Sequence, residues 1–352
     1  MARPRVLICG TLGWTQQECA DLFEDVAEVI QYDSRNRTDF ISSFQPGGRY
    51  EDVVALYKDG GSYFLGPFDR ELIGAISRSV KYIANIGAGY DQIDTDACRD
   101  NGILLTNTPG VVDEGTATAA LYLMISVVRQ FAKAEQDIRA GRWNFEHSAG
   151  SAHDLTGRTL AILGMGGIGM RLAELARAFP MRIVYHNRRK VEDAPEWCEY
   201  FGIDRLDEML AITDVLSVHV PLKDDTVGFV NEAMIRRLKK GAVIVNTARG
   251  KVIDEEAMIR ALEDGHVSPT GFTDTTTKAY HSDHQLAGVG LDVFTNEPDV
   301  DTRLLELPNA ALLPHMGCLT RETLEKMEIR ALTNLRDMVV TGSAKDVVPE
   351  LR

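Results

Sequence analysis

Short runs rich in β-branched and apolar residues alternate with helix-length segments along most of the chain, and this alternation limits the possible folds more than any other feature. Short apolar runs separated by helical patterns are typical of parallel βαβ units. The first series of runs is R-V-L-I-C, V-V-A-L-Y, V-K-Y-I-A-N and I-L-L-T-N. The second is T-L-A-I-L-G, R-I-V-Y-H, D-V-L-S-V-H-V, A-V-I-V-N-T, V-G-L-D-V-F and A-A-L-L-P. The sequence therefore predicts an α/β protein with two parallel sheets.

Two helical patterns suggest how the chain divides into domains. The segment from Asp113 to Arg139 has almost no breakers and is apolar nearly all round, which predicts a long buried connecting helix. The last helical pattern, from Thr320 to Val340, could cross back to the first sheet. We therefore expect one discontinuous domain of residues 1–112 and 319–352, with a second domain of residues 113–318 inserted into it.

Composition and charge restrict the partners of the chain. Of its 352 residues, 44% are apolar and 26% charged, as in soluble globular proteins. The formal net charge of −14 argues against nucleic acids and anionic membranes, which both need a basic surface. No apolar run reaches the roughly 18 residues of a membrane span, and no signal peptide precedes the first strand. Five scattered cysteines without a C-x-x-C pair indicate reduced thiols, so we expect a cytoplasmic protein.

The stretch I-L-G-M-G-G-I-G places Gly164, Gly166 and Gly169 in G-x-G-x-x-G spacing, with Gly167 and Ile168 between them. It follows a strand pattern and precedes a helical one, which is the context that makes this motif specific. Such glycines let the backbone approach a pyrophosphate at the helix N-terminus. The sequence therefore predicts a dinucleotide site rather than only a tight turn.

The next strand pattern ends at Y-H-N-R-R-K and carries no acid. Sites that prefer NAD normally place Asp or Glu here for the ribose 2′-hydroxyl, whereas arginine accommodates a 2′-phosphate. Asn187 lacks a repelling charge, and Arg188 and Arg189 could both bind the phosphate. We predict that NADP(H) is preferred and NAD(H) possible. The alternative is a solvated basic strand end.

Three residues that follow later strands could share one site. Arg249, Glu297 and His315 lie in N-T-A-R-G, T-N-E-P and L-P-H-M-G. A guanidinium can bind a carboxylate and polarise a carbonyl, a histidine can supply a proton, and a carboxylate can orient the imidazole. Taken singly, His315 could be a structural histidine, Arg249 a surface arginine and Glu297 part of a turn. Their joint occurrence favours a catalytic site.

These motifs also carry a family resemblance over nearly the whole chain. The matching stretches are N-I-G-A-G-Y-D-Q-I-D, T-N-T-P-G, G-M-G-G-I-G, Y-H-N-R-R, H-V-P-L, N-T-A-R-G, G-L-D-V-F-x-x-E-P and L-P-H-M-G. In this order they resemble the D-isomer-specific 2-hydroxyacid dehydrogenase family, near the glyoxylate/hydroxypyruvate reductases, including the fungal type. The resemblance implies two Rossmann-like or flavodoxin-like domains, with the active site in the cleft between them. It also implies a homodimer built partly on the connecting helix.

The resemblance assigns roles to individual residues. It implies that Arg249 binds substrate, that Glu297 pairs with His315, and that His315 is the acid/base. Asp292 is expected to meet the nicotinamide carboxamide. Further cofactor contacts are expected from Val220, Pro221, Thr226, Thr247, Ala248, Arg249, His315 and Gly317. Backbone N–H groups around Gly87, Ala88 and Gly89 are expected to receive the substrate carboxylate.

The implied activity is NAD(P)H-dependent reduction of a small 2-oxo acid to the D-2-hydroxy acid, and the reverse oxidation. Glu297 supports hydroxyacid chemistry, because the related formate dehydrogenases resemble this family but place glutamine beside the histidine. One alternative is a bulkier aromatic substrate of the phenylpyruvate or mandelate type, for which Tyr63 or Phe64 could line the pocket. Another is a cofactor-sensing corepressor of the same fold, although such proteins keep an acid where this chain has Asn187.

One segment departs from the family. Arg249 and Glu297 are further apart here than in relatives, and the extra residues map to Val267–Gln285. The segment is rich in Thr, Ser, Asp and Gly, which is typical of a surface loop. Its ends would be compatible with the splice borders of a retained intron. It contains His281 and His284, but two loop histidines rarely form a metal site, and no metal is predicted.

Overall fold

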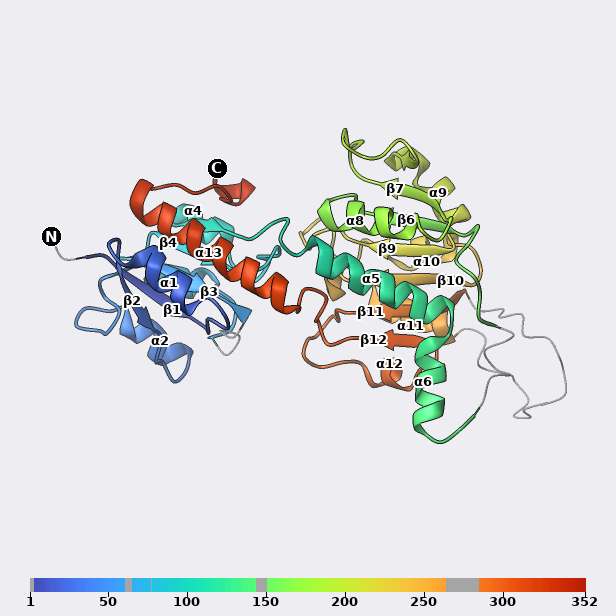
Figure 1. The fold of residues 1–352 in the computed structure, drawn as a ribbon, viewed down its shortest axis with the longest axis horizontal. Helices are drawn as coiled ribbons and strands as arrows, with labels where there is room; N and C mark the ends of the chain where they lie inside the picture. The colour runs from blue at the N-terminus through green and yellow to red at the C-terminus, as the bar shows by residue number, and fades with distance from the viewer. Residues whose placement is uncertain (1–2, 61–64, 77, 144–150, 264–284) are drawn as a thin grey trace. The chain divides into compact units, whose positions relative to one another are not determined.

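The computed structural model describes the whole chain except residues 1–2, 61–64, 77, 144–150 and 264–284. The chain forms two compact units (Figure 1). Unit 1 comprises Met1–Val112 and Leu319–Arg352, and unit 2 comprises Asp113–Cys318. Each unit contains one parallel sheet, as the strand patterns predicted.

Unit 1 contains a five-stranded parallel sheet with the order β2-β1-β3-β4-β5. Its strands are β1 Arg5–Cys9, β2 Glu28–Gln31, β3 Val53–Lys58, β4 Tyr82–Asn85 and β5 Leu104–Thr106. Its helices are α1 Gln16–Phe23, α2 Arg37–Ser43, α3 Arg70–Ile76, α4 Thr95–Asp100, α13 Arg321–Thr341 and the 3₁₀ turn η4 Pro349–Leu351. Strand β2 was not predicted from the sequence.

The sheet of unit 1 is covered on both faces, because successive strand side chains point to opposite sides. In β1, Leu7 and Cys9 enter the core under α2 and α3, whereas Val6 and Ile8 enter the core under α1 and α13. A strand buried on both faces reads as a continuous apolar run, which explains R-V-L-I-C.

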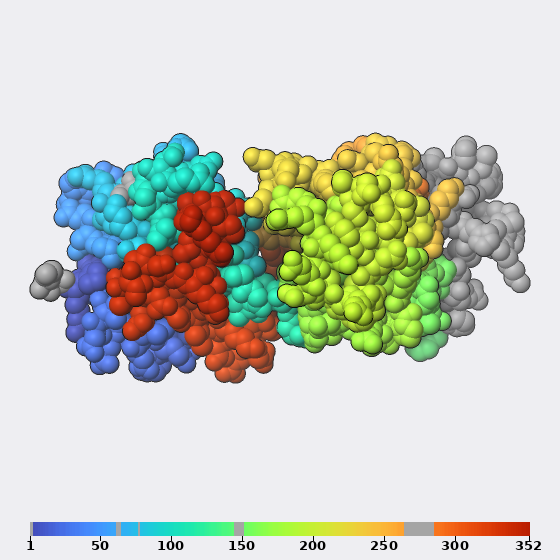
Figure 2. Space-filling view, turned by 90° about the horizontal axis from the view of Figure 1, so that it is seen from above, coloured from blue at the N-terminus to red at the C-terminus, as the bar shows by residue number. Residues whose placement is uncertain are grey.

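The C-terminal helix α13 belongs to unit 1, where it packs against β3 and β4. Thr320 caps its N-terminus through the Thr323 N–H, and Gly342 ends it in the left-handed conformation. Its Glu328 carboxylate is buried and accepts hydrogen bonds from the Gly13 N–H and the Thr15 hydroxyl. Figure 2 shows this C-terminal segment, in red, lying against the blue and cyan N-terminal residues.

Unit 2 contains a seven-stranded parallel sheet with the order β12-β11-β10-β9-β6-β7-β8. Its strands are β6 Thr159–Leu163, β7 Arg182–His186, β8 Cys198–Phe201, β9 Val215–Val218, β10 Ala242–Asn246, β11 Leu286–Leu291 and β12 Ala310–Leu312. Its helices are α5 Asp113–Val128, α6 Phe131–Arg139, α8 Gly167–Ala176, α9 Leu206–Ile212, α10 Glu232–Arg237, α11 Glu255–Glu263 and α12 Thr302–Glu306, with 3₁₀ turns η2 Ile203–Arg205 and η3 Gly250–Val252.

The segment predicted as one long buried helix forms two helices instead. Helix α5 packs closely on β11, because Gly290 leaves room for Leu123: a Cβ on Gly290 would lie 2.8 Å from the Leu123 Cβ. The helix stops before Gln130, whose φ of 58° is left-handed. In α6 that follows, only Asp137 is buried. The apolar character that suggested a single helix belongs to α5 alone.

Three sequence-based expectations concern residues that are only partly described. The segment 267–285 lies outside the described residues except for Gln285, whose amide donates to the carbonyls of Ile235 and Leu238 just before β11. Tyr63 and Phe64 also lie outside them, as do His281 and His284.

All five cysteines are free. No helix in the described part of the chain is long and apolar enough to cross a membrane.

Candidate functional site

The glycine-rich loop of unit 2 joins β6 to α8, and its first and last glycines lie close to neighbouring backbone atoms. Gly164 has a φ of 100°, and a Cβ there would lie 2.8 Å from the carbonyl carbon of His219. A Cβ on Gly169 would lie 2.4 Å from the Gly164 carbonyl oxygen. A Cβ on Gly166, in contrast, would meet nothing within 4 Å. The first and last glycines are therefore required by the fold, and the middle one leaves open space beside the start of α8.

A carboxylate lies at the start of the same helix. A Cβ on Gly167 would lie 1.9 Å from an Asp113 oxygen, and burial raises the pKa of Asp113 above its usual range. Ile168 packs partly against the core behind α8. The N-terminal turn of α8 thus lies close to the Asp113 carboxylate, which would have to move to make room for a side chain at Gly167.

The end of β7 brings its polar residues to this loop. The Asn187 side-chain oxygen accepts the Met165 N–H at 2.6 Å, so the amide supports the glycine-rich loop. The Arg188 side chain is 84% exposed, with a guanidinium nitrogen 3.5 Å from the Asp225 carboxylate. Arg189 follows it at the surface. The two guanidinium groups are placed where a ligand could reach them, whereas Asn187 is already occupied.

The loop after β9 lies next to the glycine-rich loop, because a Cβ on Gly164 would lie 2.9 Å from the Val220 nitrogen. The Thr226 hydroxyl donates to the Pro221 carbonyl at 2.7 Å and accepts the Lys223 N–H at 2.7 Å. Thr226 therefore shapes its own loop. At the end of β10, the buried Thr247 hydroxyl has no hydrogen-bond partner among the described residues.

Arg249 is held by the turn that follows β10. The Asn246 side chain accepts the Ala248 N–H at 3.0 Å and donates to the Arg249 carbonyl at 2.9 Å. The next residue, Gly250, touches the loop after β11, since a Cβ there would lie 1.9 Å from the Phe294 carbonyl carbon. This contact brings the arginine turn and the glutamate loop together within unit 2.

Asp292, just after β11, holds the chain around His315. Its carboxylate accepts the N–H groups of Met316 at 2.7 Å and Gly317 at 2.8 Å, and its carbonyl accepts the His315 N–H at 2.8 Å. His315 is left-handed, with a φ of 52°. Burial raises the pKa of Asp292, although these two backbone hydrogen bonds oppose the rise.

Glu297 and His315 form a direct pair. Glu297 Oε2 lies 2.7 Å from His315 Nδ1, and Glu297 Oε1 accepts the Phe294 N–H at 2.9 Å. Burial opposes ionisation of Glu297, but these hydrogen bonds and the charges of His315 and Arg249 outweigh it and lower its pKa. A carboxylate on Nδ1 orients the imidazole ring and leaves Nε2 for a substrate.

In unit 1, the loop after β4 turns its carbonyl groups toward the protein. The carbonyls of Gly87, Ala88 and Gly89 accept hydrogen bonds from the Thr108 N–H, the Asn107 amide and the Asn85 amide, respectively. The Gly87 N–H donates to the Thr108 hydroxyl at 2.8 Å. The N–H of Gly87 is therefore in use within the protein. Among the described residues, the N–H groups of Ala88 and Gly89 form no hydrogen bond.

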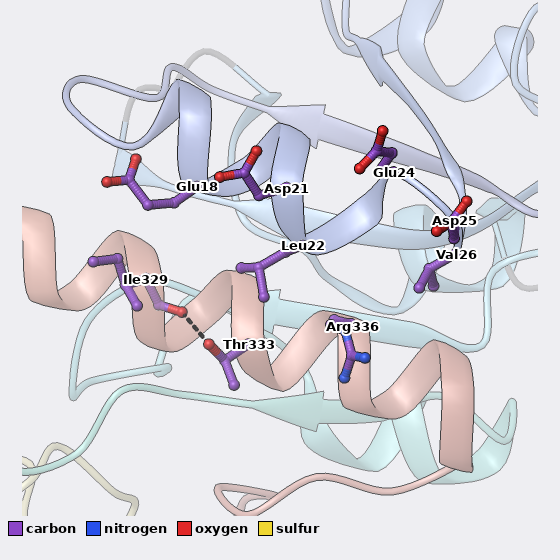
Figure 3. Close-up of a pocket in the computed structure, with 9 residues that line it drawn as sticks. All are labelled: Glu18, Asp21, Leu22, Glu24, Asp25, Val26, Ile329, Thr333 and Arg336. Carbon is purple, nitrogen blue, oxygen red and sulfur yellow. Dashed lines mark hydrogen bonds between the residues drawn. The ribbon is translucent and has the colours of Figure 1, made fainter.

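A groove between α1 and α13 in unit 1 is lined by none of these residues (Figure 3). Its lining carries the four carboxylates of Glu18, Asp21, Glu24 and Asp25, and one guanidinium from Arg336. This negative lining would repel an anionic ligand, such as an organic acid or a nucleotide phosphate. We therefore do not include the groove in the candidate site.

Unit 2 fits a nicotinamide dinucleotide. The glycine-rich loop leaves open space at a helix N-terminus, the condition for binding a pyrophosphate. Two arginines follow β7, and the Thr247 hydroxyl is buried without a partner in the described structure. No group of three or more His, Cys, Asp or Glu side chains in the described ranges is arranged to hold a metal ion.

Sequence reasoning missed the residues that hold this arrangement in place. Asn246, Gly250 and Asp113 were not singled out, although Asn246 contacts Arg249, Asp113 contacts Gly167, and Gly250 follows Arg249 in the chain. The polar residue at the end of the apolar run A-V-I-V-N was the available signal for Asn246. Gly250 and Asp113 act through tertiary contacts that no local pattern contains.

Comparison with known proteins finds relatives along the whole chain. Residues 121–279 match the family described as D-isomer specific 2-hydroxyacid dehydrogenase, NAD binding domain. The chain is 38% identical to the 4-methyl-2-oxopentanoate reductase A of Aspergillus oryzae, over 99% of this chain and 98% of the relative. It is similar to the crystal structure of a glyoxylate reductase from Paecilomyes thermophila, with 39% identity, full coverage of both chains and a TM-score of 0.88.

A bacterial structure is similar as well. It is an NADPH-dependent glyoxylate/hydroxypyruvate reductase from Sinorhizobium meliloti, in complex with NADP and malonate. It is 29% identical over 99% of this chain and 98% of that chain, with a TM-score of 0.79.

Two glycine substitutions should separate the structural and binding roles of the glycine-rich loop. Gly164→Ala forces a side chain into a left-handed position against backbone, so we expect a loss of about 1–3 kcal/mol in stability. Gly166→Ala has room in the protein and should melt like the unaltered chain. Its methyl group would occupy the space for a pyrophosphate, so its affinity for NADPH should fall. Thermal unfolding and fluorescence titration measure the two effects, and unchanged NADPH affinity in Gly166→Ala would contradict this placement.

Proposed function

Because the chain belongs to the D-isomer-specific 2-hydroxyacid dehydrogenase family, we propose that it reduces a small 2-oxo acid to the D-2-hydroxy acid, and catalyses the reverse oxidation. The proposed substrates are of the glyoxylate or hydroxypyruvate type. The observation that carries the proposal is the 2.7 Å pair of Glu297 and His315, in the same unit as the glycine-rich loop. This pair can hold and release the one proton that the reaction exchanges.

The residues of the pair divide the proton chemistry between them. His315 Nδ1 is engaged by Glu297, so Nε2 is the nitrogen that gives its proton to the carbonyl oxygen during reduction. The ionised Glu297 stabilises the imidazolium before transfer. When bound, the nicotinamide supplies the hydride. In the oxidation direction, Nε2 takes the proton of the hydroxyl group.

Arg249 and the unit 1 loop bind the substrate in this proposal. The guanidinium of Arg249 holds the carboxylate and polarises the carbonyl. The N–H groups of Ala88 and Gly89 also receive the carboxylate, since they form no hydrogen bond in the described part of the protein. Gly87 contributes its left-handed turn, with a φ of 113°, rather than its N–H.

The cofactor is proposed to be NADP(H) in preference to NAD(H). Arg188 and Arg189 follow β7, where an acid would select NAD. Asp292 is proposed to meet the nicotinamide carboxamide, beside Gly317. The remaining contacts are proposed for Val220, Pro221, Thr226, Thr247 and Ala248. The Sinorhizobium relative, which is NADPH-dependent, supports the preference.

A bulkier substrate is the second candidate. The Aspergillus relative is named for 4-methyl-2-oxopentanoate, a branched 2-oxo acid, and it is 38% identical to this chain. A pocket that accepts such a side chain would turn over the small oxo acids less efficiently. Substrate ranking therefore distinguishes the two candidates.

The assembly and location are proposed from exposed apolar side chains and free thiols. We propose a homodimer that uses α5 and α6, where Tyr122, Phe131 and Ile138 are exposed apolar side chains. The free cysteines suit a reducing compartment such as the cytoplasm.

The first test is oxidation of NADPH and NADH in parallel, followed by absorbance, with glyoxylate, hydroxypyruvate and 4-methyl-2-oxopentanoate. We expect turnover of the small oxo acids, faster with NADPH. Turnover only with the branched acid would select the second candidate. If no oxo acid is reduced while NADPH still binds, the corepressor-like alternative gains support and the proposed activity fails.

Replacing the carboxylate of the pair should change the pH dependence. Glu297→Gln keeps a hydrogen-bond acceptor on Nδ1 but removes the charge that favours the imidazolium. We expect kcat for reduction to fall by about 100-fold. The low-pH loss of activity that follows protonation of Glu297, whose pKa is lowered although burial opposes this, should also disappear in this variant.

A neighbouring carboxylate provides the control for this change. Glu255 accepts the Thr295 N–H in the same loop, at 3.2 Å, without touching His315. Glu255→Gln should leave the pH profile in place. Equal profiles for Glu297→Gln and the unaltered protein would exclude the pair from proton transfer.

Removing one guanidinium should test the cofactor preference. Arg188→Ala deletes a charge-assisted contact with the 2′-phosphate, so KM for NADPH should rise by about 10- to 100-fold. KM for NADH should change little. Arg182→Ala, at the opposite end of β7 and paired with Glu199, is the matched control. A similar change for both cofactors would show that Arg188 does not read the phosphate.

A further inference from the structure

A buried lysine lies at the carboxyl edge of the unit 1 sheet. Lys58 is the last residue of β3 and is only 5% exposed. The chain leaves β1 for β2 on one side and returns to β3 on the other. In parallel sheets of this order, ligands bind outside the carboxyl ends of the strands at such a reversal. Lys58 is therefore placed where a ligand is expected.

The ammonium group of Lys58 has few partners for a buried charge. Among the described residues, its one hydrogen-bond contact is with the Asn85 side-chain oxygen at 3.5 Å, longer than the usual range of about 2.7–3.2 Å. The ammonium also lies 5.5 Å from the centre of the Phe68 ring. The carboxylates of Asp59 and Asp91 attract this charge. Burial lowers the pKa of Lys58, and the charge of Asp59 only partly opposes this. A buried cation of this kind is stabilised when an anion reaches it.

Asn85 connects Lys58 to the loop after β4. The same Asn85 side chain that contacts the ammonium through its oxygen donates its amide to the Gly89 carbonyl at 3.1 Å. Asn85 is itself 4% exposed, so this link is buried. In register, Lys58 pairs with Asn85 across β3 and β4. Asn85 thus contacts both the ammonium and the Gly89 carbonyl of the loop whose Ala88 and Gly89 N–H groups form no hydrogen bond in the described part of the protein.

We propose that Lys58 is the charged element of the carboxylate-binding site in unit 1, acting on the substrate together with the N–H groups of Ala88 and Gly89. The ligand class is a 2-oxo or 2-hydroxy carboxylate, so this inference rests on the proposed function. Two N–H groups alone orient a carboxylate but supply no net charge. Lys58 supplies that charge from within unit 1, and its buried ammonium favours the binding of an anion.

The competing explanation is that Lys58 only fills space over Phe68. The two explanations differ in what the charge does for stability. A structural lysine stabilises the free protein, so an apolar replacement would lower its melting temperature. A ligand-binding lysine is a buried charge awaiting an anion, so an apolar replacement of similar length leaves the melting temperature equal or higher.

The experiment uses Lys58→Met, Lys58→Arg and the control Lys81→Met, which alters an exposed lysine just before β4. We expect Lys58→Met to raise KM for the oxo acid by about 10- to 100-fold, with kcat changed only a few-fold and KM for NADPH unchanged. Lys58→Arg should recover part of this loss, because it keeps the charge. Lys81→Met should resemble the unaltered protein.

A binding measurement without catalysis separates this inference from the proposed function. Oxamate, an unreactive 2-oxo acid analogue, should raise the melting temperature of the unaltered protein and not that of Lys58→Met. If no oxo acid is reduced but this difference is seen, the proposed function fails and the anion site stands. Unchanged KM and oxamate affinity in Lys58→Met, or no oxamate binding by the unaltered protein, would overturn the inference. Lys58→Gln replaces the methionine variant if that variant does not fold.

Discussion

The contacts of Asp292 with the chain around His315 are the interaction on which the rest of the candidate site depends. Asp292 joins the end of β11 to the end of β10, because its N–H donates to the Asn246 carbonyl at 2.9 Å. Its carboxylate then captures the N–H groups of Met316 and Gly317. Main-chain hydrogen bonds thereby fix the left-handed turn at His315, and the imidazole is placed before any ligand arrives. The pairing with glutamate adds charge and orientation to a ring whose position is already set.

Much of the fold could be predicted because strands buried on both faces have an apolar residue at nearly every position. The two missed strands, β2 and β8, lie at sheet edges. The sequence E-V-I-Q of β2 is largely exposed, so it lacks the apolar run that marks a central strand. The connecting segment was predicted as one helix because composition does not register the left-handed backbone at Gln130.

The candidate site divides in the same way. Arg249, Glu297 and His315 could be chosen from residue type and position after strands, since parallel strands present their carboxyl ends at one edge. The contacts that the site side chains make could not be predicted. The Asn187 amide turns to the glycine-rich loop, and the Gly87 N–H is taken by Thr108. Both facts depend on neighbours far away in sequence, which no local pattern contains.

The double attachment of Asp292 also limits how such an enzyme could change. The Asp292 carboxylate is the proposed contact of the nicotinamide and also holds the chain around His315. A substitution there therefore disturbs cofactor binding and proton transfer together. Arg188, by contrast, projects into solvent and supports no buried contact. Adaptation to another cofactor pool can therefore proceed at the ribose end by single surface changes, while the nicotinamide end is held fixed. The site thus consists of a part that selection can adjust gradually and a part that it can only keep or lose.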